Sequence, residues 1–277
     1  MIRLGGNGVP ATSDEPGDIA QGHVKFGYRA AYCPQVGLND KDRIKAIRDE
    51  FAKADVEIAE VAAWRNVVTR ELDARKAARD FVCDRLALAD EVGARCAVTY
   101  IGSLAPGSEY EPHADDLGPA AFDAFVQCAR EIIDTVRPKR TRFCIEMMQW
   151  ELPDSPEILL ELIKAIDRPA FAAHLDPVNL VVSPRQYYDT GALIRRCFEL
   201  VGPWIVSSHA KDITLGNNLS LHLDEVIPGR GMLDYRTYLS QLEGTGVPIM
   251  LEHLADADYP EARDHLKSVG KSLGIDI

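Results

Sequence analysis

The sequence lacks a long apolar run, a paired cysteine motif and an excess of basic residues. No stretch of roughly 18 uncharged apolar residues occurs, so we expect no membrane-spanning helix among the 277 residues. The amino-terminal residues turn acidic without an apolar segment, so no secretory signal is expected. Because 31 Lys and Arg face 43 Asp and Glu, the net charge is −12. A charge of this sign disfavours nucleic acid as the main partner.

The six cysteines show no C-x-x-C pair and no zinc-finger spacing to a histidine. Cys33, Cys96 and Cys144 lie in apolar, strand-like runs, where a cysteine packs as a small hydrophobic residue. We therefore expect reduced thiols in a cytoplasmic protein, with a disulfide framework as the alternative.

Short apolar segments alternate with amphipathic segments along the whole chain. The strand candidates are Ile2–Gly6, Arg29–Cys33, Asp55–Val61, Cys96–Ile101, Arg142–Met147, Phe171–Asp176, Trp204–His209 and Pro248–Glu252. The helix candidates are Lys41–Ala54, Arg75–Glu91, Pro119–Val136, Pro156–Ile166, Gly191–Leu200, Tyr235–Leu242 and Pro260–Leu273. Alternation of this kind implies parallel strands joined by helical crossovers. No G-x-G-x-x-G turn supports an open dinucleotide-binding sheet, so we predict one (β/α)8 barrel domain over residues 1–277.

Four successive strand candidates of the second half deliver a polar side chain at or near the carboxyl end. These residues are Glu146, Asp176, His209 and Glu252, separated by 30, 33 and 43 residues. In a barrel the carboxyl ends of the strands meet at one mouth, where active sites of this fold lie. Each residue alone is as readily explained by a loop cap or an arginine pair. Four in succession at the same end of the barrel indicate a metal site.

Three carboxylates and one imidazole form a hard, mostly oxygen donor set. Such a set favours Mn²⁺, with Mg²⁺ and Co²⁺ as alternatives; Zn²⁺ usually takes more nitrogen or sulfur ligands but is not excluded. We expect one divalent ion per chain. Carboxylates at these strand ends would also be costly to bury without a cation to share.

The chain resembles the xylose-isomerase-like barrel superfamily. The resemblance is best over Arg142–Leu254, where the Glu/Asp/His/Glu series is joined by two strings. One is His-Ala-Lys-Asp at residues 209–212; the other is Pro-Gly-Arg-Gly at residues 228–231, followed by Asp234. The superfamily includes sugar isomerases, ketose 3-epimerases, inosose dehydratase and apurinic-site endonucleases. The resemblance implies that Glu146, Asp176, His209 and Glu252 are the metal ligands, and that Glu146 and Glu252 act as an acid/base pair.

One position departs from the ketose epimerases, which commonly carry a substrate-binding histidine three residues after the aspartate of strand six. Here Asn179 stands there, in the string Asp-Pro-Val-Asn, which argues against simple 3-epimerisation of a ketose. This string and the ending Leu-Glu-His-Leu at residues 251–254 are similar to the catalytic subunit of C-glycoside deglycosidases. Those enzymes eliminate an aglycone from a 3-oxo sugar.

Further side chains are candidates for substrate contact. Strand alternation points Lys211 into the mouth beside His209, where it is a candidate catalytic residue that binds an oxyanion or a hydroxyl; the alternative is a surface lysine. His222, in the long loop Ile213–Gly231, is a candidate mobile acid/base group. The length of that loop predicts a lid or a binding segment. Arg230 between two glycines suits a substrate hydroxyl or phosphate, although a solvated turn is an equally good explanation.

Aromatic residues follow two strands of the first half. Trp64 after strand three and Tyr100 at the end of strand four are placed to line the mouth and to stack on a sugar, with core packing as the alternative. Trp150, four residues after Glu146, has the same alternatives. Together with Asn179 and Arg230, Trp64 and Tyr100 make up our predicted substrate-binding set.

We predict a metal-dependent enzyme that removes a proton next to a carbonyl of a sugar or cyclitol, as an isomerase or epimerase. The alternative is a lyase on 3-oxo-glycosides that works with a small partner subunit. A zinc nuclease of the apurinic-site type is a rival with little support, since the chain has only seven histidines. A degenerate barrel acting as a binding subunit is a further rival. We expect a carbohydrate substrate, no membrane partner, and a homo-oligomer or a hetero-oligomer with a small subunit.

Overall fold

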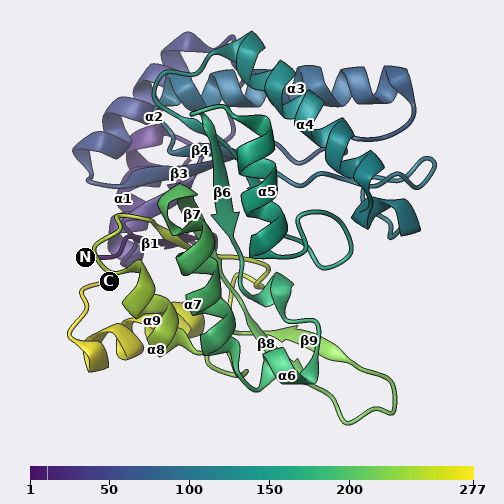
Figure 1. Cartoon of the computed structure of the whole chain (residues 1–277). Coiled ribbons are helices and arrows are strands. Elements are labelled where there is room, and N and C mark those ends of the chain that lie inside the picture. Colours follow the sequence, from purple (N-terminus) through teal and green to yellow (C-terminus); the bar gives the residue numbers. More distant parts are fainter. Residues whose placement is uncertain (11) are drawn as a thin grey trace.

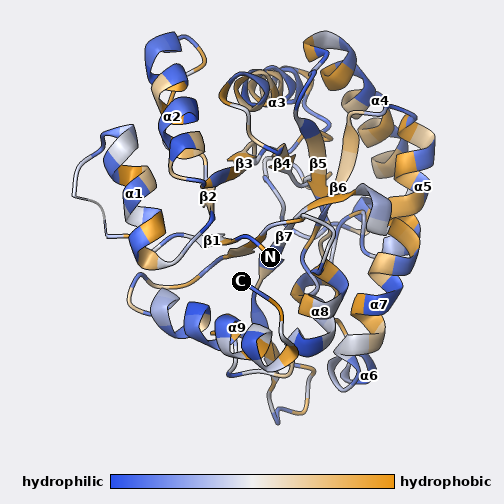
Figure 2. Cartoon of the chain, turned by 90° about the vertical axis from the view of Figure 1, so that its left-hand side faces the viewer, coloured by the Kyte–Doolittle hydropathy of each residue, from blue (hydrophilic) through white to orange (hydrophobic). Residues whose placement is uncertain are grey.

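The computed structural model describes residues 1–10 and 12–277, and in it eight parallel strands form a nearly closed barrel (Figures 1 and 2). The order around the barrel is β1-β10-β7-β6-β5-β4-β3-β2. Among the described residues, β1 and β2 are the two ends of this order and are not paired as neighbouring strands. Next to this opening, the N–H of Arg29 donates to the carbonyl of Leu4 at 2.8 Å. The strands are β1 (Leu4–Gly6), β2 (Ala30–Tyr32), β3 (Glu57–Ala62), β4 (Cys96–Thr99), β5 (Arg142–Glu146), β6 (Phe171–Leu175), β7 (Ile205–Ala210) and β10 (Ile249–Leu251). The predicted (β/α)8 barrel is confirmed, and its strands coincide with the predicted segments apart from their end residues.

Helices lie between successive strands and surround the barrel with their apolar faces inward (Figure 2). They are α1 (Pro16–Phe26), α2 (Lys41–Lys53), α3 (Leu72–Val92), α4 (Pro119–Val136), α5 (Pro156–Ile166), α6 (Pro184–Tyr187), α7 (Thr190–Val201), α8 (Tyr235–Leu242) and α9 (Tyr259–Leu273). Short 3₁₀ turns are η1 (Ala114–Leu117), η2 (Val178–Leu180) and η3 (Gly202–Trp204). Within the described residues no helix is both long and apolar enough to cross a membrane. All six cysteines are free.

Helix α1 has no counterpart among the predicted helices. Pro16 occupies its first turn, and Gly27 ends it with a left-handed φ of 89°. Both are regular helix boundary signals. The glycines at positions 17 and 22 dilute the apolar spacing between them, so periodicity alone does not reveal this helix.

Alternation along the strands separates the core from the barrel interior. On β5, Phe143 and Ile145 belong to the large apolar cluster between strands and helices, whereas Cys144 belongs to a separate small cluster. Residues of one strand parity therefore face the helices, and those of the other parity face inward. Glu146 and Asp176 have the inward parity of β5 and β6, as the predicted metal site requires.

The long loop predicted at Ile213–Gly231 contains a β-hairpin, and its predicted role as a lid or binding segment stays a prediction. Strand β8 (Asp212–Leu215) pairs antiparallel with β9 (Leu223–Val226), and the hairpin projects from the barrel beside α6 (Figure 1). Strand β8 alternates polar and apolar side chains, whereas β9 has two adjacent acidic residues, and each strand has only four residues. Such short segments give a weak periodic signal.

Asp212 fixes the chain that returns from the hairpin to the barrel. Its buried carboxylate accepts backbone N–H groups from Ile213 and Leu233 at 2.9 Å each. It also accepts those of Gly229 at 2.8 Å and Gly231 at 3.0 Å. A Cβ on Gly231 would lie 2.3 Å from this carboxylate. The two strings at residues 209–212 and 228–231 therefore contact each other, since Asp212 of the first accepts the N–H groups of Gly229 and Gly231 of the second.

Substituting Asp212→Ala removes all four acceptor contacts and leaves buried donors without a partner. We expect the free energy of unfolding to fall by about 3 kcal/mol or more. Urea denaturation followed by circular dichroism measures this. The control Asp224→Ala, on an exposed position of the same hairpin, should change stability little. Equal stability of the two variants would show that the Asp212 contacts do not hold the segment.

Candidate metal centre and active site

The structure brings together the four side chains that were predicted to bind metal. Glu146, Asp176 and His209 are buried and Glu252 is partly exposed, and one ligand atom from each lies within 4.8 Å of the others. His209 Nδ1 is 3.2 Å from Glu146 Oε1, 3.0 Å from Glu252 Oε2 and 3.8 Å from Asp176 Oδ2. A nitrogen and three carboxylate oxygens therefore converge on one point at the carboxyl end of the barrel.

This donor set fits a divalent cation. Three hard oxygen donors and one imidazole nitrogen suit Mn²⁺, Mg²⁺ or Co²⁺. In addition, Asp176 Oδ2 and Glu252 Oε2 are buried oxygens that accept no well-aligned hydrogen bond from the described residues, although Lys211 Nζ lies 2.9 Å from each. A divalent cation at this point would share these two oxygens with Lys211.

Lys211 also reaches the cluster, as predicted from strand alternation. Its Nζ lies 2.9 Å from Asp176 Oδ2 and 2.9 Å from Glu252 Oε2. Burial alone would raise the pKa of the Asp176 carboxyl and lower that of the Lys211 ammonium. The attraction between the two groups outweighs burial, so the pKa of Asp176 is lowered and that of Lys211 is raised.

Glu252 and His209 show the same balance. Burial opposes the charge of both, but the charge of His209 is the largest opposing influence on the Glu252 carboxyl and brings its pKa to about 2. The nearby carboxylates raise the pKa of His209 well above its usual value. Asp176 and Glu252 are therefore ionised at neutral pH, which is the form of a carboxylate that holds a cation.

A second buried network lies on the other side of His209. Glu60 of β3 is 2% exposed, and its carboxylate lies 3.3 Å from His209 Nε2 and 3.0 Å from His174 Nε2. Ser207 donates to the same carboxylate. The two nitrogens of His209 thus have different partners: Nδ1 faces the metal cluster and Nε2 faces Glu60. The arrangement matches the carboxylate–histidine–metal pattern, in which an outer carboxylate orients the ligand.

A pocket of about 350 Å³ reaches two of the four metal-competent side chains, Glu146 and Glu252. Its lining includes the predicted Trp64, Tyr100, Asn179 and Lys211 as well as Glu146 and Glu252. Asn179 Nδ2 donates to Glu146 Oε1 at 3.2 Å, so the asparagine contacts a candidate catalytic carboxylate. The remaining lining residues are Tyr110, Met148, Gln149, Trp150, Glu225 and His253.

Two predicted residues do not reach this pocket. His222 is exposed near the hairpin turn and lies 3.3 Å from Asp224. Arg230 is exposed and forms a two-pronged ion pair with Glu261, both contacts 2.7 Å long. The length of the hairpin carries His222 away from the mouth, and Glu261 of α9 holds Arg230 on the outer surface. The structure gives neither residue a contact with the site, and their predicted roles lack geometric support.

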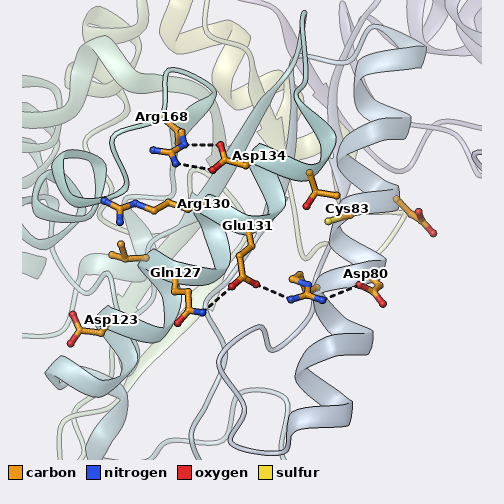
Figure 3. A pocket seen from close by; sticks show the side chains of 12 residues that line it. Asp80, Cys83, Asp123, Gln127, Arg130, Glu131, Asp134 and Arg168 are labelled. Carbon is orange, nitrogen blue, oxygen red and sulfur yellow. Dashed lines mark hydrogen bonds and ion pairs between the residues drawn. The ribbon is translucent and has the colours of Figure 1, made fainter.

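A wider hollow of about 900 Å³ lies outside the barrel, between α3 and α4 (Figure 3). Arg79 pairs with Glu131 at 2.8 Å, and Arg168 pairs with Asp134 at 2.7 Å. The lining of this hollow has five carboxylates and three arginines, so it is acidic overall. None of the four metal-competent side chains lines it. The pocket at the barrel mouth is therefore the candidate active site.

The family follows from a match over most of the chain. Residues 24–269 match the family model described as xylose isomerase-like TIM barrel. The chain belongs to this family. The resemblance inferred from the four strand-end residues and the two strings is thus confirmed, whereas no sequence among curated proteins matches the chain significantly.

Solved structures of this barrel type agree in fold at low sequence identity. A xylose isomerase-like TIM barrel protein from Mycobacterium smegmatis, in complex with magnesium, has a TM-score of 0.69 at 19% identity, covering 99% of this chain and 97% of its own. D-psicose 3-epimerase from Clostridium cellulolyticum, with D-tagatose, has a TM-score of 0.70 at 14% identity and 99% coverage of both chains. The 3-keto-D-glucoside 4-epimerase from E. coli has a TM-score of 0.68 at 11% identity, covering 98% and 100%.

Several site residues of this xylose isomerase-like barrel are absent from our predictions. Glu60 lies where the register between β2 and β3 shifts, so that Ala31 pairs with Ile58 but Tyr32 with Glu60. Strict alternation would place Glu60 on the same face as Ile58, which packs in the outer core. The shift breaks that period and turns Glu60 to the interior. No sequence signal marks the shift, whereas His253 could have been found as the direct neighbour of Glu252.

Glu225 and His253 form a rim above the cluster. His253 Nδ1 lies 3.2 Å from Glu225 Oε2 of β9, and its Nε2 lies 3.6 Å from Glu252 Oε2. His253 has a left-handed φ of 56°, a backbone conformation that is uncommon for a residue other than glycine. The hairpin thus contributes to the pocket through Glu225, not through the predicted His222.

Substituting Glu60→Gln removes the charge that faces His209 Nε2 and leaves the four metal-competent groups in place. We expect the affinity for Mn²⁺ to fall about 10- to 100-fold, because an outer carboxylate sets the orientation and basicity of a histidine ligand. Calorimetric titration of the metal-free protein with Mn²⁺ measures the dissociation constant, and circular dichroism checks the fold. The control is Glu57→Gln, on the same strand but paired with Arg95. A folded Glu60→Gln protein with unchanged affinity would show that Glu60 does not support the ligand.

Proposed function

We propose that the protein is a divalent-metal-dependent enzyme that removes and returns a proton next to the carbonyl of a sugar or cyclitol. One observation carries this proposal: four metal-competent side chains converge at a pocket that is large enough for a sugar and is lined by polar and aromatic residues. The four side chains are Glu146, Asp176, His209 and Glu252. Relatives of the same fold are named as sugar epimerases, and one is named as a magnesium complex. Mn²⁺ is the ion we propose, from the hard donor set.

A bound divalent ion would polarise the substrate carbonyl and stabilise the negative charge that develops on its oxygen. Glu252, at the pocket rim, is placed to take the proton from the adjacent carbon, and Glu146 is the second carboxylate that returns one. Asn179 holds Glu146 through its Nδ2. Lys211 neutralises Asp176 and Glu252 and can donate to a substrate oxygen. Trp64 and Tyr100 supply apolar surface for the sugar ring.

A lyase on 3-oxo-glycosides is the second candidate, because one relative is named as acting on a 3-keto-D-glucoside. Loss of the same proton leaves an electron pair that can expel a leaving group at the β carbon instead of being reprotonated. The chain's own residues are the same in both reactions, and the fate of the substrate distinguishes them.

Exchange of substrate hydrogen for deuterium tests the proposal. The metal-free protein should take up close to one Mn²⁺ per chain, measured by elemental analysis after gel filtration. In deuterated water the Mn²⁺ form should place deuterium next to the carbonyl of a ketose or of a 3-oxo-glucoside, as read by NMR. A chelator should abolish exchange, and added Mn²⁺ should restore it. A protein that binds no metal would disprove the site, and a loaded protein that exchanges nothing would disprove the reaction.

Replacing either candidate acid/base residue should stop the reaction without unfolding the barrel. Glu146→Gln and Glu252→Gln should each lower kcat at least about a hundredfold, because each loses a metal ligand together with a proton carrier. Turnover of the exchanging substrate measures this, with circular dichroism as the fold check. Glu199→Gln, on the exposed surface of α7, should retain full activity. Near-normal turnover in either site variant would mean that the chemistry lies elsewhere. Assembly with further subunits and a cytoplasmic location stay predictions.

A further inference from the structure

Four aromatic side chains form a continuous row along one wall of the pocket. The row consists of Trp64, Tyr100, Tyr110 and Trp150, all of which line the pocket. Trp64 and Tyr100 are stacked, with ring centroids 5.8 Å apart and planes 15° apart. Tyr110 and Trp150 are stacked in the same way, at 6.3 Å and 16°. Tyr100 and Tyr110 join the two pairs, at 5.5 Å.

The row presents ring surface more than hydrogen-bonding groups. The Tyr100 hydroxyl donates to Glu109 at 3.3 Å, and the Trp150 indole N–H donates to the carbonyl of Tyr110 at 2.9 Å. These two polar atoms are therefore already occupied by the protein. Tyr110 keeps 48% of its surface exposed although it is a large aromatic side chain. Exposed aromatic surface that lines a pocket is a common feature of ligand sites.

The rest of the pocket lining is mostly polar and acidic. It includes Glu146, Glu225 and Glu252 beside Lys211 and His253, and its described residues include no arginine. Asp176 adds a further carboxylate to the cluster beneath. Glu151 adds little charge at neutral pH, because burial, aided by Asp116 and Glu146, raises its pKa to about 8. Even with a divalent ion bound, the positive charges of the ion and Lys211 do not exceed the four carboxylates Glu146, Asp176, Glu225 and Glu252. No surplus positive charge is left to attract a phosphate or carboxylate on the substrate, so the charge favours an uncharged ligand.

We propose that the pocket binds an uncharged sugar derivative that carries a flat aromatic substituent. The sugar lies at the polar part of the lining with the metal cluster, and the substituent stacks on the aromatic row. A bare monosaccharide has one apolar face, which a single ring such as Trp64 already covers. A second sugar would require hydrogen-bond partners for its hydroxyl groups. Two polar groups of the row, the Tyr100 hydroxyl and the Trp150 indole N–H, are already bonded to protein atoms. This proposal rests on the proposed function for the position of the sugar.

Binding of simple glucosides tests the substituent without any turnover. Calorimetry on the Mn²⁺-loaded protein compares phenyl β-D-glucopyranoside with methyl β-D-glucopyranoside, cellobiose and glucose 6-phosphate. We expect the phenyl glucoside to bind at least about tenfold tighter than the methyl glucoside, since aromatic stacking adds to the area buried. We also expect cellobiose to exceed the affinity of the methyl glucoside by less than the phenyl glucoside does, and glucose 6-phosphate to bind most weakly of the four. The proposal is overturned if cellobiose binds more tightly than the phenyl glucoside. It is also overturned if the protein binds the phenyl glucoside no more tightly than the methyl glucoside, or binds neither.

Substitutions in the row locate the preference. Tyr110→Ala and Trp150→Ala should each reduce the phenyl-to-methyl affinity ratio at least about threefold, whereas Tyr110→Phe should retain it. Tyr188→Ala and Trp204→Ala are matched controls, because both side chains are exposed and neither lines the pocket. These controls should keep the unsubstituted protein's ratio. A ratio that is unchanged in both row variants would show that the row does not contact the substituent.

The binding and exchange experiments fail independently. Deuterium exchange into a ketose requires the metal cluster and no aromatic substituent. The phenyl preference requires the row and no proton abstraction. If the protein prefers the phenyl glucoside but exchanges no deuterium, the proposed ligand class stands and the proposed reaction is disproved. If it exchanges deuterium but has no phenyl preference, the proposed reaction stands and the ligand class is disproved.

Discussion

The mutual repulsion of four carboxylates in one barrel is the constraint around which the site is built. Glu60, Glu146, Asp176 and Glu252 all approach His209 within 4 Å. Removing a carboxylate from water costs several kcal/mol unless a partner compensates it. His209 and Lys211 supply part of that compensation, since both lie against Asp176 Oδ2 and Glu252 Oε2, but neither gives these oxygens a well-aligned hydrogen bond. A divalent cation is the partner that would complete the balance, which makes metal binding a matter of stability as well as catalysis.

The fold was predictable because a parallel barrel repeats one pattern. Strands β5, β6 and β10 alternate core and interior positions, so a polar residue at the carboxyl end can be placed without coordinates. Glu146, Asp176 and Glu252 follow this rule, and the structure brings them together with His209. The register of β7 shifts between Ile205 and Ser207, so His209 was found from its place at the carboxyl end and not from an unbroken period. The rule depends on an unbroken period of two. Glu60 sits at a register shift, where that period fails, and it was missed although it is more deeply buried than Glu252.

Loop-borne residues were less predictable, for a different reason. Tyr110 lies ten residues beyond Tyr100, in a connection with no periodicity, and only the fold returns its ring to the pocket. His222 and Glu225 lie three residues apart in one hairpin, yet only Glu225 lines the pocket. A sequence pattern can mark this hairpin as unusually long. It cannot say which of its side chains faces the mouth, because that depends on how β8 and β9 are anchored by Asp212.

The string His-Ala-Lys-Asp shows how chemistry and structure are joined in one short segment. His209 faces the donor cluster, Lys211 neutralises two of its carboxylates, and Asp212 turns the other way to hold the returning chain. Three successive functions thus depend on the strand period around β7. The four metal-competent side chains come entirely from the second half of the chain, whereas Trp64, Tyr100 and Tyr110 come from the first. The segment that carries the family resemblance therefore holds the candidate metal ligands. Most of the aromatic row lies outside that segment, so the residues of the row and the metal-competent residues can change independently of one another.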